Sequence, residues 1–392
     1  MRRLALLPFL LLGVAAAQPV TLSGEIRHRS ELDDRDAGAV EAATPVHLLR
    51  TRLAADARPA PHVRAFVQVQ DARRWGEERT TLDGDADQLD LHQAFFELDS
   101  LAGRPVAIRV GRQELSYGNQ RLVGAVGWSN VGRSFDAARL RWTGPATVDV
   151  FAAQLATTAG EAPAQALVGA FATAVRGPLT IEAIALVDGD AGRIAEGPDA
   201  GARQRQRVTA GARIHGRLGR IGLDAEAYGQ GGARAGADGQ PRDDIRAWLA
   251  SIQLSAEAGP LVLAVGATRL SGDADPADGV DRRFDTLFAT NHKFYGAMDV
   301  FPRGTAGLDD LFASVTASPV AGWRLQATGH AFATAVDAGG GRALGTELDL
   351  DASRAVAAGA RLGLGASVFR ATDRLDIDAT TAWSYLMASV AF

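Results

Sequence analysis

The chain of 392 residues contains no cysteine, so disulfide bonds, thiol catalysis and cysteine-ligated metal sites are excluded. Lysine is almost absent as well. Because Lys293 is the only one, nearly all positive charge is arginine, whose planar guanidinium matches carboxylate and phosphate groups and stays charged at any relevant pH. The formal net charge of −5 argues against non-specific binding of nucleic acid.

The sequence also lacks the common catalytic and cofactor motifs. It contains no GxxxxGK[ST], HExxH or GxSxG pattern, and its seven histidines are scattered. We therefore predict no catalytic residue, no enzymatic activity and no bound cofactor. The stretch from Asp273 to Asp281 (DADPADGVD) resembles a loose calcium loop that lacks the closing glutamate, and it leaves only weak divalent cation binding as an expectation.

Long apolar runs are missing except at the N-terminus. Arg2 and Arg3 precede an apolar run over residues 4–14, and three alanines follow before Gln18. This is the pattern of a secretory signal peptide, because eleven apolar residues are too few to span a bilayer as a helix, which needs about 20. We predict a cleaved signal over residues 1–17 and one domain over residues 18–392.

The rest of the chain alternates apolar and polar residues with period two, which predicts β-strands. Val63, Val67 and Val69, for example, alternate with Arg64 and Gln68. In a soluble sandwich the apolar set would face a core, whereas in a membrane barrel it faces lipid and the polar set lines the lumen.

The connections between these strands distinguish the two architectures. Short segments rich in glycine and proline take turns with longer polar segments, which is the layout of a bacterial outer-membrane barrel. Counting strands through this rhythm predicts an all-β, transmembrane, antiparallel β-barrel of about eighteen strands, with sixteen as the alternative. The short connections are residues 56–61, 100–105, 143–146, 176–179, 216–220, 257–260, 318–322 and 354–359.

The C-terminus has its own pattern. Every second residue of the last strand lies on one face: Ser384, Leu386, Ala388 and Val390. The chain stops on the aromatic Phe392. Such a strand resembles the segment that outer-membrane barrels present to the barrel-assembly machinery. We therefore expect the protein to lie in the outer membrane of a Gram-negative-type bacterium, in contact with its lipid.

Two segments resemble the alginate-export family of outer-membrane porins. They are residues 111–124 (GRQELSYGNQRLVG), continued by Trp128, Asn130 and Arg133, and residues 292–301 (HKFYGAMDVF). The resemblance implies a monomeric eighteen-stranded barrel whose electropositive constriction passes a polyuronate chain outward.

Strand parity sorts the arginines, since those that alternate with lipid-facing residues must point inward. This rule predicts a set of lumen arginines that would bind and admit anions. Inward carboxylates that pair with them structurally are the competing interpretation, with Asp224, Glu226, Glu347, Asp349 and Asp351 as partners. The predicted lumen arginines are Arg50, Arg52, Arg64, Arg109, Arg139, Arg141, Arg213, Arg324 and Arg361.

Both family-like segments fall in long connections, which in large barrels often fold inward and narrow the lumen. Arg112, Arg121, Arg133 and Lys293 are accordingly the predicted cations of a constriction. A solvated surface loop is the alternative.

The sequence thus predicts an anion-selective porin or exporter that passes an anionic polysaccharide, such as alginate or related uronates, by passive diffusion. Two alternatives remain open: a general porin for small organic anions, and a plugged structural or adhesive barrel.

Overall fold

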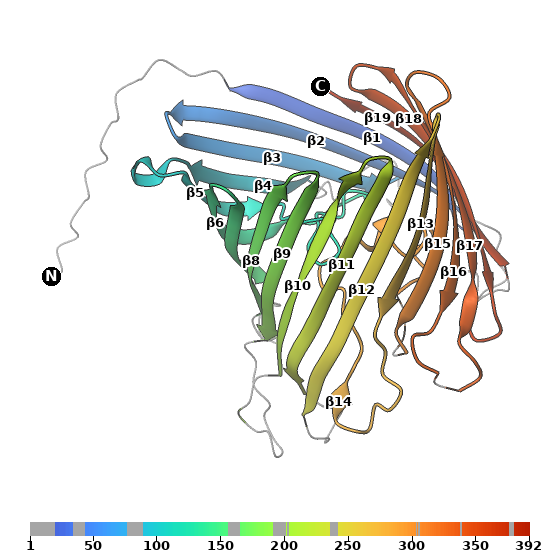
Figure 1. Ribbon diagram of the computed structural model, residues 1–392. Coiled ribbons are helices and arrows are strands. Elements are labelled where there is room, and N and C mark those ends of the chain that lie inside the picture. The colour runs from blue at the N-terminus through green and yellow to red at the C-terminus, as the bar shows by residue number, and fades with distance from the viewer. Residues whose placement is uncertain are drawn as a thin grey trace.

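The computed structural model describes residues 20–33, 44–76, 89–155, 165–190, 201, 204–235, 242–302, 304, 306–337, 339–375 and 380–392. Eighteen antiparallel strands pair with their neighbours along the chain, and β1 pairs with both β2 and β19, which closes the sheet into a barrel (Figure 1). The predicted eighteen-stranded barrel is confirmed, and the alternative count of sixteen is wrong.

The barrel strands are β1 (Thr21–Asp33), β2 (Thr44–Ala60), β3 (Val63–Arg74), β4 (Leu89–Leu98), β5 (Val106–Gln113), β6 (Phe135–Thr143), β7 (Thr147–Leu155), β8 (Gln165–Arg176), β9 (Leu179–Asp190), β10 (Arg205–Leu218), β11 (Ile221–Arg234), β12 (Asp243–Ala258), β13 (Leu261–Leu270), β15 (Leu308–Ala317), β16 (Trp323–Ala333), β17 (Ala343–Ala357), β18 (Ala360–Ala371) and β19 (Thr380–Ala391).

The remaining elements are small. The two-residue β14 (Val280–Asp281) pairs in parallel with the outer end of β12, and the two short 3₁₀ helices are η1 (Leu101–Gly103) and η2 (Asn291–Lys293). No helix within the described ranges is long and apolar enough to cross a membrane.

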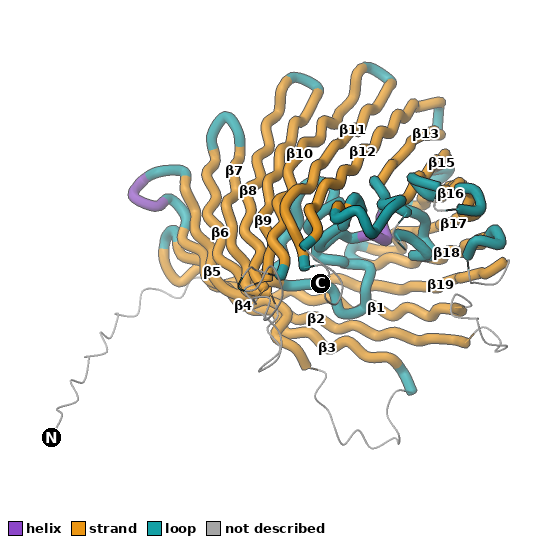
Figure 2. Tube along the Cα trace, turned by 90° about the horizontal axis from the view of Figure 1, so that it is seen from below, coloured by secondary structure: helices purple, strands orange, loops and turns teal. Residues whose placement is uncertain are grey.

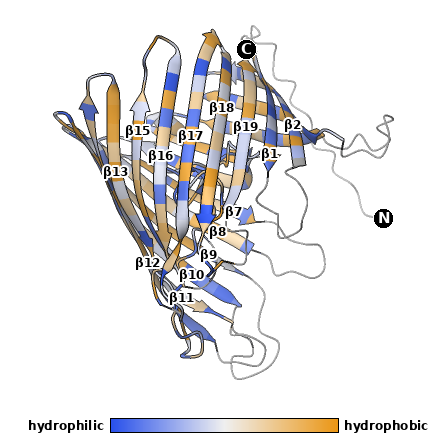
Figure 3. Cartoon of the chain, turned by 90° about the vertical axis from the view of Figure 1, so that its right-hand side faces the viewer, coloured by the Kyte–Doolittle hydropathy of each residue, from blue (hydrophilic) through white to orange (hydrophobic). Residues whose placement is uncertain are grey.

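Alternation along each strand builds an apolar outer face and a polar inner face. On the outer face Val67, Leu140 and Val265 are 42–57% exposed, whereas on the inner face Gln70 and Asp149 are almost fully buried by other lumen groups. Figure 3 shows the resulting bands of hydrophobic and hydrophilic residues along the strands. The outer face is therefore the lipid-facing surface of the barrel.

The two ends of the barrel differ. Tight turns join the strands at one end, where Gly177, Gly219 and Gly259 take positive φ angles that other residues rarely adopt. The backbones of Gly24 and Phe392 exchange hydrogen bonds of 2.8 and 3.0 Å at this end, where the sheet closes. All the long connections leave from the other end, called here the outer end. The predicted signal peptide, residues 1–17, lies outside the described residues.

Candidate functional site in the barrel lumen

Two long connections fold into the lumen and meet there. The first lumen loop comprises residues 114–134 and the second comprises residues 271–307. Gly124 donates to the carbonyl oxygen of Phe288 (2.9 Å), and Phe288 donates to that of Leu122 (2.9 Å). Viewed from the outer end, these loop segments lie inside the ring of strands (Figure 2). The predicted inward folding of both loops is thus confirmed.

Apolar side chains fill the outer half of the lumen between the loops and the strands. Leu122 and Val123 of the first loop, and Tyr295 and Met298 of the second, are at most 3% exposed. They belong to a cluster that also contains inward-facing strand residues such as Phe151, Leu186, Leu249 and Phe369. Burial of this size fixes the loops in place, since each fully buried large side chain contributes roughly 1.5–3 kcal/mol.

Arginines of one side of the lumen hold the first loop by its backbone. Arg27 donates to the carbonyl oxygens of Gly127 (2.7 Å) and Ser129 (2.9 Å). Arg29 donates to the carbonyl oxygen of Trp128 (2.6 Å), and its guanidinium lies 4.1 Å from the centre of the Trp128 ring. These contacts tie the loop tip to β1.

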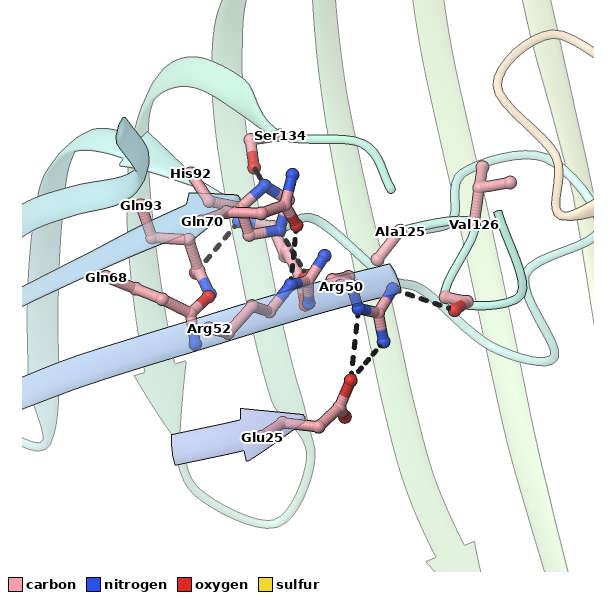
Figure 4. A network of polar contacts seen from close by, with 12 residues as sticks. Glu25, Arg50, Arg52, Gln68, Gln70, His92, Gln93, Ala125, Val126 and Ser134 are labelled. Carbon is pink, nitrogen blue, oxygen red and sulfur yellow. Dashed lines mark hydrogen bonds and ion pairs between the residues drawn. The ribbon is translucent and has the colours of Figure 1, made fainter. Parts of the chain in front are cut away.

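Arg50 and Arg52 of β2 continue this side of the lumen (Figure 4). Arg50 donates to Glu25 (2.6 Å) and to the carbonyl oxygen of Ser129 (3.1 Å). Arg52 donates to Gln70 (2.6 Å) and reaches Glu114 of the first loop at 3.3 Å. We call this side the basic wall; its arginines are Arg27, Arg29, Arg50, Arg52, Arg109, Arg139 and Arg141 on β1, β2, β5 and β6.

Carboxylates of β17, which is separated from β1 by β18 and β19, hold the second loop. Glu347 of β17 accepts the backbone N–H of Met298 (2.9 Å), and Asp349 accepts that of Ala297 (3.3 Å). We call this side the acidic wall; its carboxylates are Asp310, Glu347, Asp349 and Asp351 on β15 and β17.

Arg121 crosses the lumen from the first loop. It pairs with Glu226 of β11 at 2.8 Å, and its guanidinium lies 3.5 Å from the centre of the Phe294 ring. Asn119 and Tyr228 also donate to Glu226 at 2.9 Å. Because both members of the ion pair are buried, this contact is a structural anchor.

The structure places the other predicted lumen arginines on the inner face, and most are paired. Glu97 lies between Arg109 (2.6 Å) and Arg139 (3.2 Å). The remaining pairs are Arg64 with Asp56, Arg141 with Asp149, and Arg213 with Asp224 and Glu182. Arg133 donates to the carbonyl oxygens of Phe288 and Ala289, and so joins the two loops.

Besides Arg133, three predicted cations have no carboxylate partner within the described part of the chain. Arg324 donates to Gln326 (2.6 Å) and Arg361 to Ser353 (3.5 Å). The ammonium group of Lys293 has neither a hydrogen bond nor an ion pair with a described residue. Burial and the nearby Arg213 both lower the pKa of Lys293 below its ordinary value of 10.5.

A cavity of about 580 Å³ lies in the lumen beneath the second loop. Lys293, Arg121 and Arg324 line it together with carboxylates that are already in use: Asp224 pairs with Arg213, Asp310 with His330, and Asp351 accepts the Tyr385 hydroxyl. The cations that remain available to a solute in this cavity are therefore Lys293 and Arg324.

The predicted lumen position of Arg112 is wrong. Arg112 alternates with the inward residues Arg109 and Gln113 on β5, so its side chain lies on the outer face, where it pairs with the exposed Asp136 at 3.3 Å. The prediction took it as part of the inward loop, but β5 continues through Gln113.

The sequence interpretation missed several lumen arginines. Arg27 and Arg29 alternate with Ile26 and His28, which is the same signal that identified Arg50. Arg207, which pairs with Asp188 (2.9 Å) and Asp285 (2.6 Å), alternates with Val208 in the same way.

The acidic stretch from Asp273 to Asp281 is engaged by arginines. Asp278 pairs with Arg282 (2.7 Å), and Asp281 pairs with Arg283 and Arg234. Within the described ranges no group of three or more histidine or acidic side chains is arranged to hold a metal ion.

The closed barrel, its apolar outer belt and its loop-narrowed polar lumen define an outer-membrane porin. Solved porins share the fold at low identity. OccAB4 of Acinetobacter baumannii has a TM-score of 0.66, 10% identity, and coverage of 96% of this chain and 99% of that chain. A BenF-like porin from Pseudomonas fluorescens Pf-5 has a TM-score of 0.65, 13% identity, and coverage of 96% and 100%.

OpdK of Pseudomonas aeruginosa, solved with vanillate, has a TM-score of 0.61, 11% identity, and coverage of 95% of this chain and 98% of that chain. No curated protein matches the sequence. The family model for alginate export matches residues 18–388, and the chain belongs to this family.

Proposed function

We propose that this porin is anion-selective and passes acidic saccharides, such as alginate or related uronates, by passive diffusion with no catalytic step. The observation that carries the proposal is the arrangement of like charges on the basic wall. Arg27 lies directly opposite Arg50 across β1 and β2, and Arg109 lies opposite Arg139 across β5 and β6. Like charges in direct cross-strand register destabilise a sheet. Glu25 pairs with Arg50, and Glu97 is shared by Arg109 and Arg139, so these four arginines have two carboxylates between them and leave an excess of positive charge that attracts anions.

The charged side chains that line the cavity also favour anions. Its carboxylates are engaged by arginine, histidine, tyrosine or backbone N–H groups, whereas Lys293 and Arg324 keep donors for a solute. A chain of sugar acids needs several weak contacts at different depths, because one tight site would hold it in place. Arg361, Arg324 and Lys293 would supply such contacts.

Channel block tests the proposed substrate class. The refolded mature chain is inserted into a planar bilayer, and the ion current is recorded while oligouronates of increasing length are added to either side. We expect transient, length-dependent block by oligouronates and none by neutral oligosaccharides of the same length. Equal block by charged and neutral sugars would contradict the proposal.

A second candidate is a porin for small organic anions. It is favoured by the apolar packing of the outer half of the lumen and by the fold shared with OpdK, which was solved with vanillate. Flux into liposomes separates the two candidates: entry of monomeric carboxylates without any block by oligouronates would favour the smaller substrates. An absence of any current would indicate a plugged structural barrel.

We further propose that export begins with cleavage after Ala17, and that a monomer is inserted into the outer-membrane lipid through recognition of the last strand, which ends at Phe392. Sequencing the N-terminus of the protein purified from membranes tests the cleavage, with Gln18 as the expected first residue.

A further inference from the structure

A groove of about 780 Å³ lies on the lipid-facing side of the barrel wall, behind the strands whose inner face lines the lumen cavity. It crosses β12, β13, β15 and β16 and reaches the start of β17. Half of the outward residues that line it are alanines. The outward residues that line it are Trp248, Ala250, Ile252, Ala267, Arg269, Asp309, Leu311, Ala331, Ala333 and Ala343.

Strand register explains the depth of the groove. Ala250, Arg269, Asp309, Ala333 and Ala343 form one cross-strand row, so three of its five positions are alanines. In the next row towards the turn end, Ala267 and Ala331 lie on either side of Leu311. The alanines in these two rows leave a hollow bordered by the larger side chains of Trp248, Ile252 and Leu311.

Arg269 and Asp309 line the outer end of the groove, and Arg342, the residue before the lining residue Ala343, lies against Asp309 without itself lining the groove. Arg269 and Arg342 both contact Asp309, so two guanidinium groups share one carboxylate. Backbone carbonyl oxygens hold both arginines in place: Arg269 donates to Ala335, and Arg342 donates to Thr334 at 2.7 Å. The Nη1 atom of each has no partner among the described residues. Each arginine is therefore held in place by the protein and keeps a donor for a ligand.

The groove lies at the depth of the outer leaflet. Arg269 and Asp309 are one residue from the outer ends of β13 and β15, and Trp248 stands beside them with its side chain exposed. Aromatic residues gather at the membrane interface in such barrels. A cationic end at headgroup level above an alanine-lined apolar floor matches one ligand chemistry: a phosphate group attached to acyl chains.

We propose that this groove is a binding site for a phosphate-bearing, multi-acyl glycolipid of the outer leaflet. Arg269 and Arg342 donate to its phosphate, and an acyl chain lies on Ala267, Leu311 and Ala331. The proposal depends on the barrel alone, and its failure would leave the proposed anion selectivity untouched.

Native mass spectrometry of the mature barrel with bisphosphorylated lipid A as the probe tests the site. Three variants are compared with the parent: Arg269→Gln/Arg342→Gln removes the headgroup donors, Ala331→Trp fills the groove, and Arg246→Gln is the matched control. Arg246 also faces outward near the outer end of β12 and pairs with Asp244, but it neither lines the groove nor contacts Asp309. Circular dichroism confirms that each variant is a folded barrel.

We expect lipid A retention to fall about tenfold in the double arginine variant, because charge-assisted hydrogen bonds to phosphate are lost. Retention should also fall in Ala331→Trp and stay unchanged in Arg246→Gln. Equal retention by all variants would overturn the proposal, as would equal binding of dephosphorylated lipid A. A dimer abolished by Ala331→Trp, without lipid retention in the parent, would show that a second copy of the chain covers the groove and would also overturn it.

Discussion

The basic wall and the acidic wall hold the lumen loops with opposite chemistry. On the basic wall, guanidinium groups donate to carbonyl oxygens at the tip of the first loop. On the acidic wall, carboxylates accept backbone N–H groups of the second loop. Most charged side chains of the two walls therefore hold the lumen loops in place. The charges that are left set the preference for anions or cations.

The two walls also differ in how much of their charge is paired. Each acidic-wall carboxylate has a partner inside the protein. On the basic wall, by contrast, Arg27 has no carboxylate partner among the described residues, Arg109 and Arg139 share Glu97, and the cavity has two cations without carboxylates. Substitutions of the loop anchors should therefore have larger effects than substitutions of the remaining charges.

The largest effect is expected from Glu226→Ala. This change leaves Arg121 buried without its carboxylate, which costs about 3–5 kcal/mol when one partner of a buried pair is removed. The first loop should then leave the lumen, and single-channel conductance should rise several-fold with added noise. Glu257→Ala is the control, because Glu257 forms an exposed pair with Arg217 outside the lumen. Unchanged conductance in Glu226→Ala would show that this pair does not hold the constriction.

A smaller but specific effect is expected from Arg109→Gln/Arg139→Gln. Removing this opposed pair lowers the positive potential of the basic wall, so the anion-to-cation permeability ratio should fall several-fold while conductance stays similar. Arg112→Gln is the matched control, since Arg112 lies on the same strand but on the outer face. The same loss in both variants would contradict the assignment of inner and outer faces.

Neutralising the acidic wall should act in the opposite direction. Asp351→Asn removes one carboxylate from the cavity while its amide still accepts the Tyr385 hydroxyl. We expect a modest rise in the anion-to-cation permeability ratio. A fall in that ratio would mean that the carboxylates do not oppose anion entry.

The smallest effect concerns pH. Lys293 is charged below its lowered pKa and neutral above it. Its contribution to anion preference should therefore be lost as the pH rises through this lowered pKa, before the ordinary lysine value of 10.5 is reached. In Lys293→Arg this decline should be absent, because arginine stays protonated. An identical pH profile in both proteins would exclude Lys293 from the permeation path.

The sequence was sufficient to predict the barrel, its strand number and the inner face of most arginines, because period-two alternation and turn composition are local properties. It also located the two constriction loops through their length and their family-like motifs. Arg112 was misplaced because the end of β5 carries no local signal that separates the strand from the loop.

The sequence could not predict which groups the charged lumen side chains contact. Arg121 and Glu226 are 105 residues apart, and their contact depends on how the first loop crosses the lumen. The acceptors of Arg27 and Arg29 are backbone carbonyl oxygens, which every residue possesses. No side-chain pattern therefore distinguishes an arginine that anchors a loop from one that meets a solute.

We propose that the charges left after loop anchoring make the lumen anion-selective. The most direct test is the reversal potential of the unmodified mature barrel in a planar bilayer under a potassium chloride gradient. We expect a reversal potential of the sign set by chloride permeation. Its magnitude should fall as the salt concentration on both sides is raised, because salt screens the lumen charges. A reversal potential at zero, or of the sign set by potassium, would contradict the proposal.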